Sequence, residues 1–193
     1  MSPCEKYVLT WSPRADVGFT VWNFQMVEVI REFDCEREED STTYKWSFDG
    51  SYLAKKFTKE QEKDGKTKIK EGLSVYTLPS MQLLVDSQGQ KKSITVEGIT
   101  DWEWSPIRNL VVFTSFSKTV EGQTQIDPKV GFLKIPERKV VSLKSIKNSE
   151  SLKLVLHPQG YYLAVINEYH TKKSTQYSVE LFDINDTRSD FFP

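Results

Sequence analysis

A short phrase that recurs three times constrains the fold of this 193-residue chain more than any other feature. Each copy consists of an apolar strand, a tight turn and a second apolar strand. The copies are YKWSFDGSYLA (44–54), WEWSPIRNLVV (102–112) and LVLHPQGYYLA (154–164). The last residues of the first strands, Trp46, Trp104 and Leu156, are separated by 58 and 52 residues. Short strands and turns that repeat at this period are typical of radially repeated β-sheets.

A third strand comes after the two strands and the turn of each copy, and it carries a large residue near its centre. These strands are TVWNF (20–24), SVYTL (74–78), GFLKI (131–135) and ELFDI (180–184). A fourth strand follows three of them, at 27–33, 81–85 and 139–143. One unit therefore contains four antiparallel strands, which is the arrangement of a propeller blade. The loops between them vary in length because pairing requires only that the apolar faces keep their register.

The repeat divides the chain into two complete blades and two incomplete ones. The turn and second strand recur at SPCEKYVL (2–9) without a first strand before them. We therefore expect an all-β chain that forms a partial WD40-like β-propeller of about four blades and is an excerpt of a longer protein. The expected divisions are one propeller fragment over 1–193, with a partial blade at 1–40, blades at 41–94 and 95–147, and a partial blade at 148–193.

The amino-acid composition indicates a folded domain with a well-solvated surface and does not indicate a particular partner. The chain is 38% hydrophobic and 27% charged, with a net charge of -1. A nucleic-acid-binding module usually has a strong positive excess, so an RNA contact would need a local patch. Cys4 and Cys35 lie far apart and are expected to be free thiols in a reducing compartment. No window resembles a membrane span or a secretion signal, so a cytoplasmic location without membrane contact is expected.

Residues for catalysis are sparse. The two histidines, His157 and His170, have no partner at metal-ligand spacing, and no phosphate loop or nucleophile elbow is present. We expect no enzyme activity, no cofactor, no metal and no small-molecule substrate. Asp49 and Gly50 are expected to form a strand-connecting turn, and His157 to lie in another. The tryptophans are expected to pack between blades; they are Trp11, Trp22, Trp46, Trp102 and Trp104.

The stretch 55–71, which we expect to be a loop between strands, carries seven lysines against four carboxylates. Lysines at this density can neutralise phosphates and release counterions, so the stretch is a candidate contact for RNA, the ribosome or an acidic partner. The commoner alternative is a solvated loop that keeps a sheet edge from pairing. The nominated residues are Lys55, Lys56, Lys59, Lys63, Lys66, Lys68 and Lys70.

Four phrases point to a family. They are SPCEKYVLTWSP (2–13), YKWSFDGSYLAK (44–55), LSVYTLPSMQLL (73–84) and ITVEGITDWEWSP (94–106). Their order and spacing resemble the propeller of the b subunit of eukaryotic translation initiation factor 3. The most specific parts are the turn at 2–5 and the segment at 76–81, which are not generic features of propellers. The resemblance covers about the whole chain and is looser over 109–147.

The resemblance implies a nine-bladed WD40-like propeller that acts as a non-catalytic scaffold. Such a scaffold gathers the factor's a, g and i subunits and helps the complex engage the small (40S) ribosomal subunit during initiation-complex assembly and scanning. The family's RNA-recognition motif and C-terminal helix are not found in this sequence, so contacts through them are not assigned to its residues. The alternatives are an interaction propeller of another pathway, the propeller of the monomeric initiation factor 2A, and the propeller of a peptidase or other enzyme.

Overall fold

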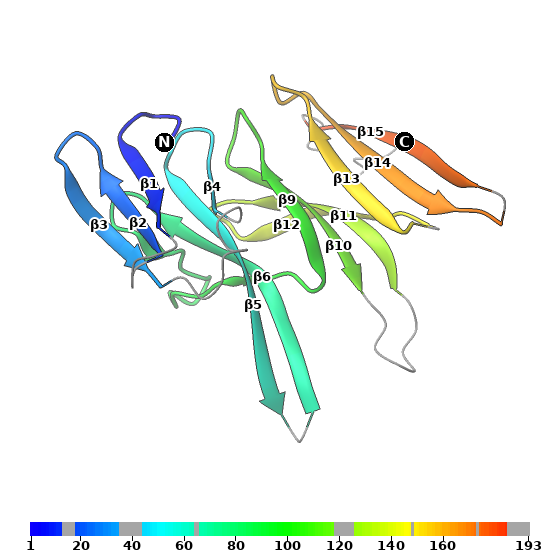
Figure 1. Cartoon of the computed structure of the whole chain (residues 1–193), viewed down its shortest axis with the longest axis horizontal. Coiled ribbons are helices and arrows are strands. Elements are labelled where there is room, and N and C mark those ends of the chain that lie inside the picture. Colours follow the sequence, from blue (N-terminus) through cyan, green and yellow to red (C-terminus); the bar gives the residue numbers. More distant parts are fainter. Residues whose placement is uncertain are drawn as a thin grey trace. The chain divides into compact units, whose positions relative to one another are not determined.

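The structure is a computed structural model, and it describes residues 1–12, 18–34, 44–63, 66–117, 126–147, 149–172 and 174–184 (Figure 1). Every helix or strand assigned within these ranges is a β-strand, and the paired strands are antiparallel. The chain divides into two compact units, Met1–Thr95 and Val96–Pro193. Within the described ranges there is no helix long and apolar enough to cross a membrane.

The first unit contains two sheets. Its strands are β1 (Tyr7–Trp11), β2 (Phe19–Asn23), β3 (Glu28–Phe33), β4 (Tyr44–Trp46), β5 (Tyr52–Lys63), β6 (Lys66–Thr77), β7 (Gln82–Leu83) and β8 (Ile94–Thr95). The first sheet has the order β1-β2-β3. The second has the order β4-β5-β6-β7, and β8 pairs with β6 beside this path. Apart from β8, strands that are consecutive within a sheet are thus neighbours in it, as in a propeller blade.

The second unit repeats this plan. Its strands are β9 (Ile99–Trp104), β10 (Leu110–Ser117), β11 (Ile126–Lys134), β12 (Lys139–Ser145), β13 (Ser151–Leu156), β14 (Tyr162–His170) and β15 (Thr175–Asp183). One sheet has the order β12-β11-β10-β9 and the other β13-β14-β15. The first strands end at Trp46, Trp104 and Leu156, where the sequence phrase predicted. The predicted all-β class is confirmed.

A buried serine closes the turn after β4. The Ser47 amide donates to the Tyr52 carbonyl at 2.9 Å, and the Ser47 hydroxyl accepts from the Tyr52 amide at 2.9 Å. The Asp49 carboxylate accepts from the Ser51 amide at 2.9 Å, and Gly50 has a φ of 71°. Asp49 and Gly50 therefore form the predicted turn, in which aspartate bonds nearby backbone and glycine adopts a left-handed conformation.

The turns before β1 and after β13 repeat the backbone bond of this turn with different residues. Before β1, the Ser2 amide donates to the Tyr7 carbonyl at 2.8 Å and the Ser2 hydroxyl accepts from the Tyr7 amide at 3.0 Å. After β13, His157 takes the serine position: its amide donates to the Tyr162 carbonyl at 2.9 Å, and its Nδ1 accepts from the Gln159 amide at 3.2 Å. The prediction that His157 lies in a turn is confirmed, and its ring has a structural role there.

The recurring turns also pack on one another within each unit. A Cβ added to Gly50 would meet the Cys4 side chain, and one added to Gly160 would meet the Ile107 side chain at 2.7 Å. Both glycines also have positive φ. A larger residue at either position would therefore be disfavoured both by the backbone conformation and by the lack of space. In each unit the turn of the second sheet thus lies against the turn of the first.

The core of the first unit lies between its two sheets. It contains Phe19, Val21, Phe33, Leu53, Tyr76 and Met81, all buried. Trp46 packs against this cluster and stacks on Tyr7 of the first sheet, with ring centroids 6.3 Å apart. In the second unit the core joins β10 and β11 to β14 and β15 through Val112, Phe132, Leu163, Val165 and Phe182. Burial on both sheets explains the apolar content of the repeated phrases.

The tryptophans do not share one role. Trp46 packs between sheets as predicted. For Trp22 and Trp11 the described contacts lie within their own sheet: the Trp22 indole N–H donates to Thr10 Oγ1 at 2.8 Å, and Trp11, which is 40% exposed, stacks on Phe19, so packing between blades stays a prediction for both. Because side chains alternate along a strand, the buried Val21 places Trp22 on the opposite face. Trp102 and Trp104 are buried.

Gly131 should not tolerate a larger residue. It pairs with Phe113, which is 2% exposed, and an added Cβ would lie 2.8 and 2.9 Å from two of its ring carbons. We expect Gly131→Ala to lower the free energy of unfolding by about 1–3 kcal/mol, measured by urea unfolding, because the ring cannot move without strain. In the control Phe113→Leu background the same change should cost less, so fully additive losses would contradict the assigned clash.

Candidate interaction surface

All seven nominated lysines lie on one long hairpin, formed by β5 and β6. The two strands have 12 residues each, and their register runs without a shift from Tyr52 opposite Thr77 to Lys63 opposite Lys66. The neighbouring strands cover only the base of the hairpin: β4 pairs up to Lys55, and β8 pairs at Gly72 and Leu73. The remainder is a two-stranded ribbon, which Figure 1 shows extending beyond the other strands of its unit.

The predicted loop over 55–71 is therefore wrong for the residues that the structure describes there. Phe57 and Thr58 continue β5, and β6 is paired without interruption from Lys66 into its buried part. Low apolar content suggested a loop, but a ribbon with two solvated faces needs few apolar residues once its register is fixed at its base. Asp64 and Gly65 lie outside the described residues.

The register sorts the charged positions onto two faces. Directly opposite residues share a face, and so do alternate residues along a strand. One face, here called the lysine face, has the positions of Lys55, Lys59, Lys63, Lys66, Lys68 and Lys70. The other, here called the acidic face, has the positions of Lys56, Glu60, Glu62 and Glu71. The backbone pairing alone supports this for Lys63, Lys66, Lys68, Glu60 and Glu62, whose side chains lie outside the described part of the structure.

Like charges are directly opposed on the lysine face. Lys59 pairs with Lys70, and the register also brings Lys63 opposite Lys66. The Lys59 side chain is exposed and that of Lys70 is half-buried. Like charges directly opposite one another destabilise a sheet, so this arrangement raises the local positive potential at some cost to the ribbon.

Lys55 has a packing role at the base of the ribbon. Its Nζ lies 5.7 Å from the centre of the Phe33 ring and 5.5 Å from that of Tyr44. A cation over aromatic faces is attracted by their quadrupoles, and the lysine is half-buried there. Lys55 therefore joins the ribbon to the core of the first unit, and the exposed Lys59 is better placed than Lys55 to meet a partner.

Arg31 is a key residue that sequence reasoning did not identify. Its guanidinium lies 4.8 Å from the centre of the Phe33 ring and 5.0 Å from that of Tyr76, and it donates to the Met81 carbonyl. It thus joins β3 of the first sheet to the turn before β7 of the second. Burial raises the pKa of the Tyr76 phenol, while the Arg31 charge and a hydrogen bond with Ser74 act in the opposite direction. The only sequence signal was a basic residue in the acid-rich stretch 28–40.

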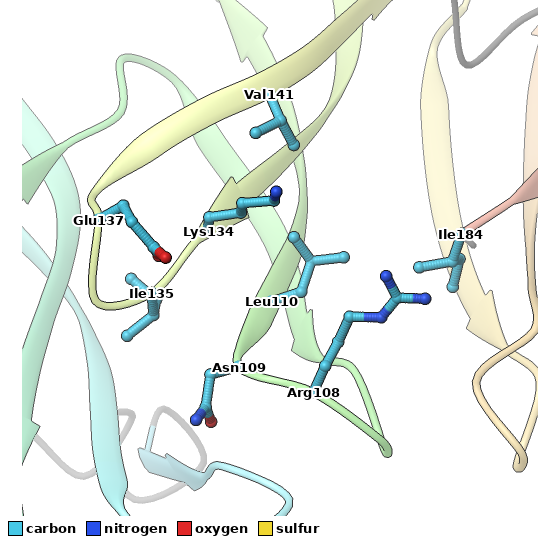
Figure 2. A pocket seen from close by; sticks show the side chains of 8 residues that line it. All are labelled: Arg108, Asn109, Leu110, Lys134, Ile135, Glu137, Val141 and Ile184. Atoms are coloured by element: carbon cyan, nitrogen blue, oxygen red, sulfur yellow. The ribbon is translucent and has the colours of Figure 1, made fainter. Parts of the chain in front are cut away.

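A pocket of about 200 Å³ lies in the second unit (Figure 2). It is lined by Arg108, Asn109, Leu110, Lys134, Ile135, Glu137, Val141 and Ile184. Figure 2 shows its charged side chains spread around the apolar ones instead of converging on one point. It is smaller than the roughly 300–1,000 Å³ of usual ligand pockets. The lining offers no nucleophile and base in hydrogen-bonding contact, so we assign no chemistry to it.

Potential metal ligands do not gather in the part of the chain that the structure describes. No group of three or more His, Cys, Asp or Glu side chains there could hold a metal ion. Cys4 is a half-buried free thiol, and Cys35 lies outside the described residues. His170 Nε2 lies 3.4 Å from a Glu150 carboxylate oxygen, with both side chains more than half exposed.

The strand order and the comparisons define the class of protein. Four sheets of consecutive antiparallel strands are blades of a partial WD40-like β-propeller. The fold is similar to a solved crystal structure of a eukaryotic initiation factor, with a TM-score of 0.62 and 22% identity over 93% of this chain and 41% of that chain. At this identity the likeness shows the fold alone. No family model matches the sequence.

Sequence comparison then gives the particular relatives. The chain is 31% identical over 188 residues to the b subunit of eukaryotic translation initiation factor 3 from Xenopus laevis, covering 95% of this chain and 24% of the relative. It is 29% identical over 227 residues to the same subunit from Cryptococcus neoformans, covering 94% and 28%. The resemblance found in the sequence phrases is confirmed: nearly the whole chain resembles a segment of this subunit. The chain spans about a quarter of the length of these relatives.

Removing the Arg31 charge should weaken the joint between the first two sheets. We expect Arg31→Met, which keeps a long apolar side chain, to lower the free energy of unfolding by about 1.5–3 kcal/mol, because it removes a charged donor from the Met81 carbonyl. Thermal or urea unfolding would measure this loss. Arg31→Lys retains the charge over the rings and should lose less. Equal stability of Arg31→Met and the parent chain would contradict this role.

A single charge reversal should stabilise the ribbon. Lys59→Glu places a carboxylate opposite Lys70, so we expect slower amide hydrogen exchange in β5 and β6 and a gain of about 0.2–1 kcal/mol at low salt. The matched control is Lys56→Glu, which makes the same charge change on the acidic face, diagonal to Glu71. It should speed exchange. Faster exchange in Lys59→Glu than in the parent chain would show that the register does not oppose Lys59 and Lys70.

Proposed function

We propose that this chain is a non-catalytic scaffold segment of the b subunit of a eukaryotic translation initiation factor 3. The observation that supports this most is the 31% identity to such a protein along 95% of the chain. The fold agrees with a scaffold, because propeller blades offer strand edges, turns and faces to several partners at once. The work of such a segment would be recognition of other molecules in the cytoplasm.

The proposed partners are the a, g and i subunits of the factor and the 40S ribosomal subunit. In this function the chain would help to hold the subunits together while the complex joins the small ribosomal subunit and scans. We propose the lysine face as the main contact with the small subunit, and Lys56, on the other face of the ribbon, as a weaker peripheral contact. A ribbon of lysines beyond the packed part of a blade can meet a negatively charged surface without rearrangement of the core.

Association in cells tests the proposal directly. The tagged protein should co-purify with the a, g and i subunits and co-sediment with 40S subunits in a sucrose gradient. Lys59→Glu/Lys70→Glu should weaken the 40S association most at low ionic strength, because an exposed contact between charges is screened by salt. Arg31→Lys serves as a control that leaves the lysine face unchanged. Co-purification with none of these subunits, together with no 40S co-sedimentation, would overturn the proposal.

A further inference from the structure

We propose that the lysine face of the β5–β6 ribbon binds the phosphate backbone of RNA without reading its base sequence. The inference deepens the proposed function and rests on it only for ribosomal RNA as the natural occupant. Binding of RNA itself follows from the charges and the register of the ribbon. It can therefore be tested without the ribosome.

The two faces of the ribbon differ in charge. The lysine face carries six lysine positions and no acidic one, while Glu60, Glu62 and Glu71 share the other face. The chain as a whole has a net charge of -1, so this face is a local surplus and not part of a generally basic surface. A surplus confined to one face produces a directed positive potential, which concentrates a polyanion on that side of the ribbon.

The lysine positions are regularly spaced along the ribbon. Alternate residues of a strand lie about 6.6–6.8 Å apart, and paired strands about 4.7–4.9 Å apart. The lysine positions therefore form a narrow double row along the ribbon, with Lys59 beside Lys70 as its described pair. Such a row can follow a phosphate backbone and neutralise several phosphates together. Each neutralised phosphate releases bound counterions, which is the main driving force of sequence-independent binding.

The residue types on the lysine face distinguish RNA from an acidic protein as its partner. The centres of protein interfaces are depleted of lysine and usually contain aromatic or arginine anchors. From Lys59 outward, the lysine-face positions contain only lysine and Gln61. An ammonium group is a strongly hydrated point charge, which suits phosphate contacts better than a packed protein interface. The composition of this face therefore favours RNA.

The same composition favours backbone contact over base readout. Bidentate recognition of bases needs arginine, asparagine or glutamine in fixed positions, and stacking on single strands needs aromatic rings. Gln61 is the one such amide among the outer lysine-face positions. The aromatic residues of this face on β5 and β6 are Phe57 and Tyr76, which lie at the base of the hairpin and not among the outer lysine positions. The major groove of an RNA duplex is also too narrow for side chains to read.

The base of the ribbon is held firmly. Lys55 lies over the rings of Phe33 and Tyr44, and a Cβ at Gly72 would meet the backbone carbonyl of Ile94. Close packing on both strands fixes the direction in which the ribbon leaves the core. A binding element on a rigid base loses less conformational freedom when it binds.

Fluorescence anisotropy with a labelled RNA duplex of arbitrary sequence tests the inference on the full chain. Binding should fall steeply between about 50 and 200 mM salt and be unchanged by a scrambled sequence. Lys59→Glu/Lys70→Glu should weaken binding at least tenfold at the lower salt, and Lys59→Gln/Lys70→Gln should reduce the salt slope by about 2. Lys56→Glu is the matched control for single Lys59→Glu and should have the smaller effect. Circular dichroism would confirm that each variant is folded.

Each result separates the possibilities. Equal losses in Lys56→Glu and Lys59→Glu would mean that total charge matters and not the face, and would overturn the inference. An affinity for polyglutamate equal to that for the RNA duplex would also overturn the inference, because it would favour an acidic protein as the partner. If the chain does not bind RNA but still associates with 40S subunits, the inference is wrong and the proposed function stands. RNA binding by a protein that joins neither the factor nor 40S subunits would support the inference alone.

Discussion

The unshifted register between β5 and β6 is the constraint on which both the packing and the candidate surface depend. At the base of the hairpin it buries Leu53 and Tyr76 against the first sheet, and the same alternation carries outward to Lys59 and Lys70. Side chains on a strand have a period of two, so a slip of one residue would exchange the two faces. Such a slip would expose the apolar residues of the core and mix lysines with glutamates. The core therefore determines the distribution of charge outside it.

The joints between sheets show how charged groups take part in this packing. In the first unit, Arg31 and Lys55 lie over buried aromatic rings between the two sheets. In the second, Lys144 lies 5.4 Å from the centre of the Phe182 ring and pairs with Glu180 at 2.7 Å. Hydrophobic burial provides most of the attraction between sheets but has little directional preference. A cation that must meet a ring and an acceptor restricts how the sheets can be placed.

Sequence reasoning found what local patterns determine and missed what distant contacts determine. The ends of the first strands at Trp46, Trp104 and Leu156 were predictable, because serine, proline, aspartate and glycine in the following turns leave a local signal. The same reasoning nominated the lysines but assumed a loop, since two faces of a solvated ribbon have no apolar alternation to reveal them. The bond from Arg31 to Met81 joins residues 50 positions apart and has no local signature. The sorting of charges needed the register, which the packed base of the hairpin fixes.

The charge pattern of the ribbon is also informative about what the ribbon is for. A ribbon arranged for stability alone would place glutamates opposite lysines, since opposite charges across strands contribute roughly 0.2–1 kcal/mol per pair. This sequence has Glu60, Glu62 and Glu71 available within the same strands, yet the register places them on the face away from Lys59 and Lys70. The ribbon thus forgoes ion pairs that a shift of one residue would supply. Local rules of stability are commonly broken where a surface serves recognition, and a phosphate backbone would supply the negative charge that the opposed lysines lack.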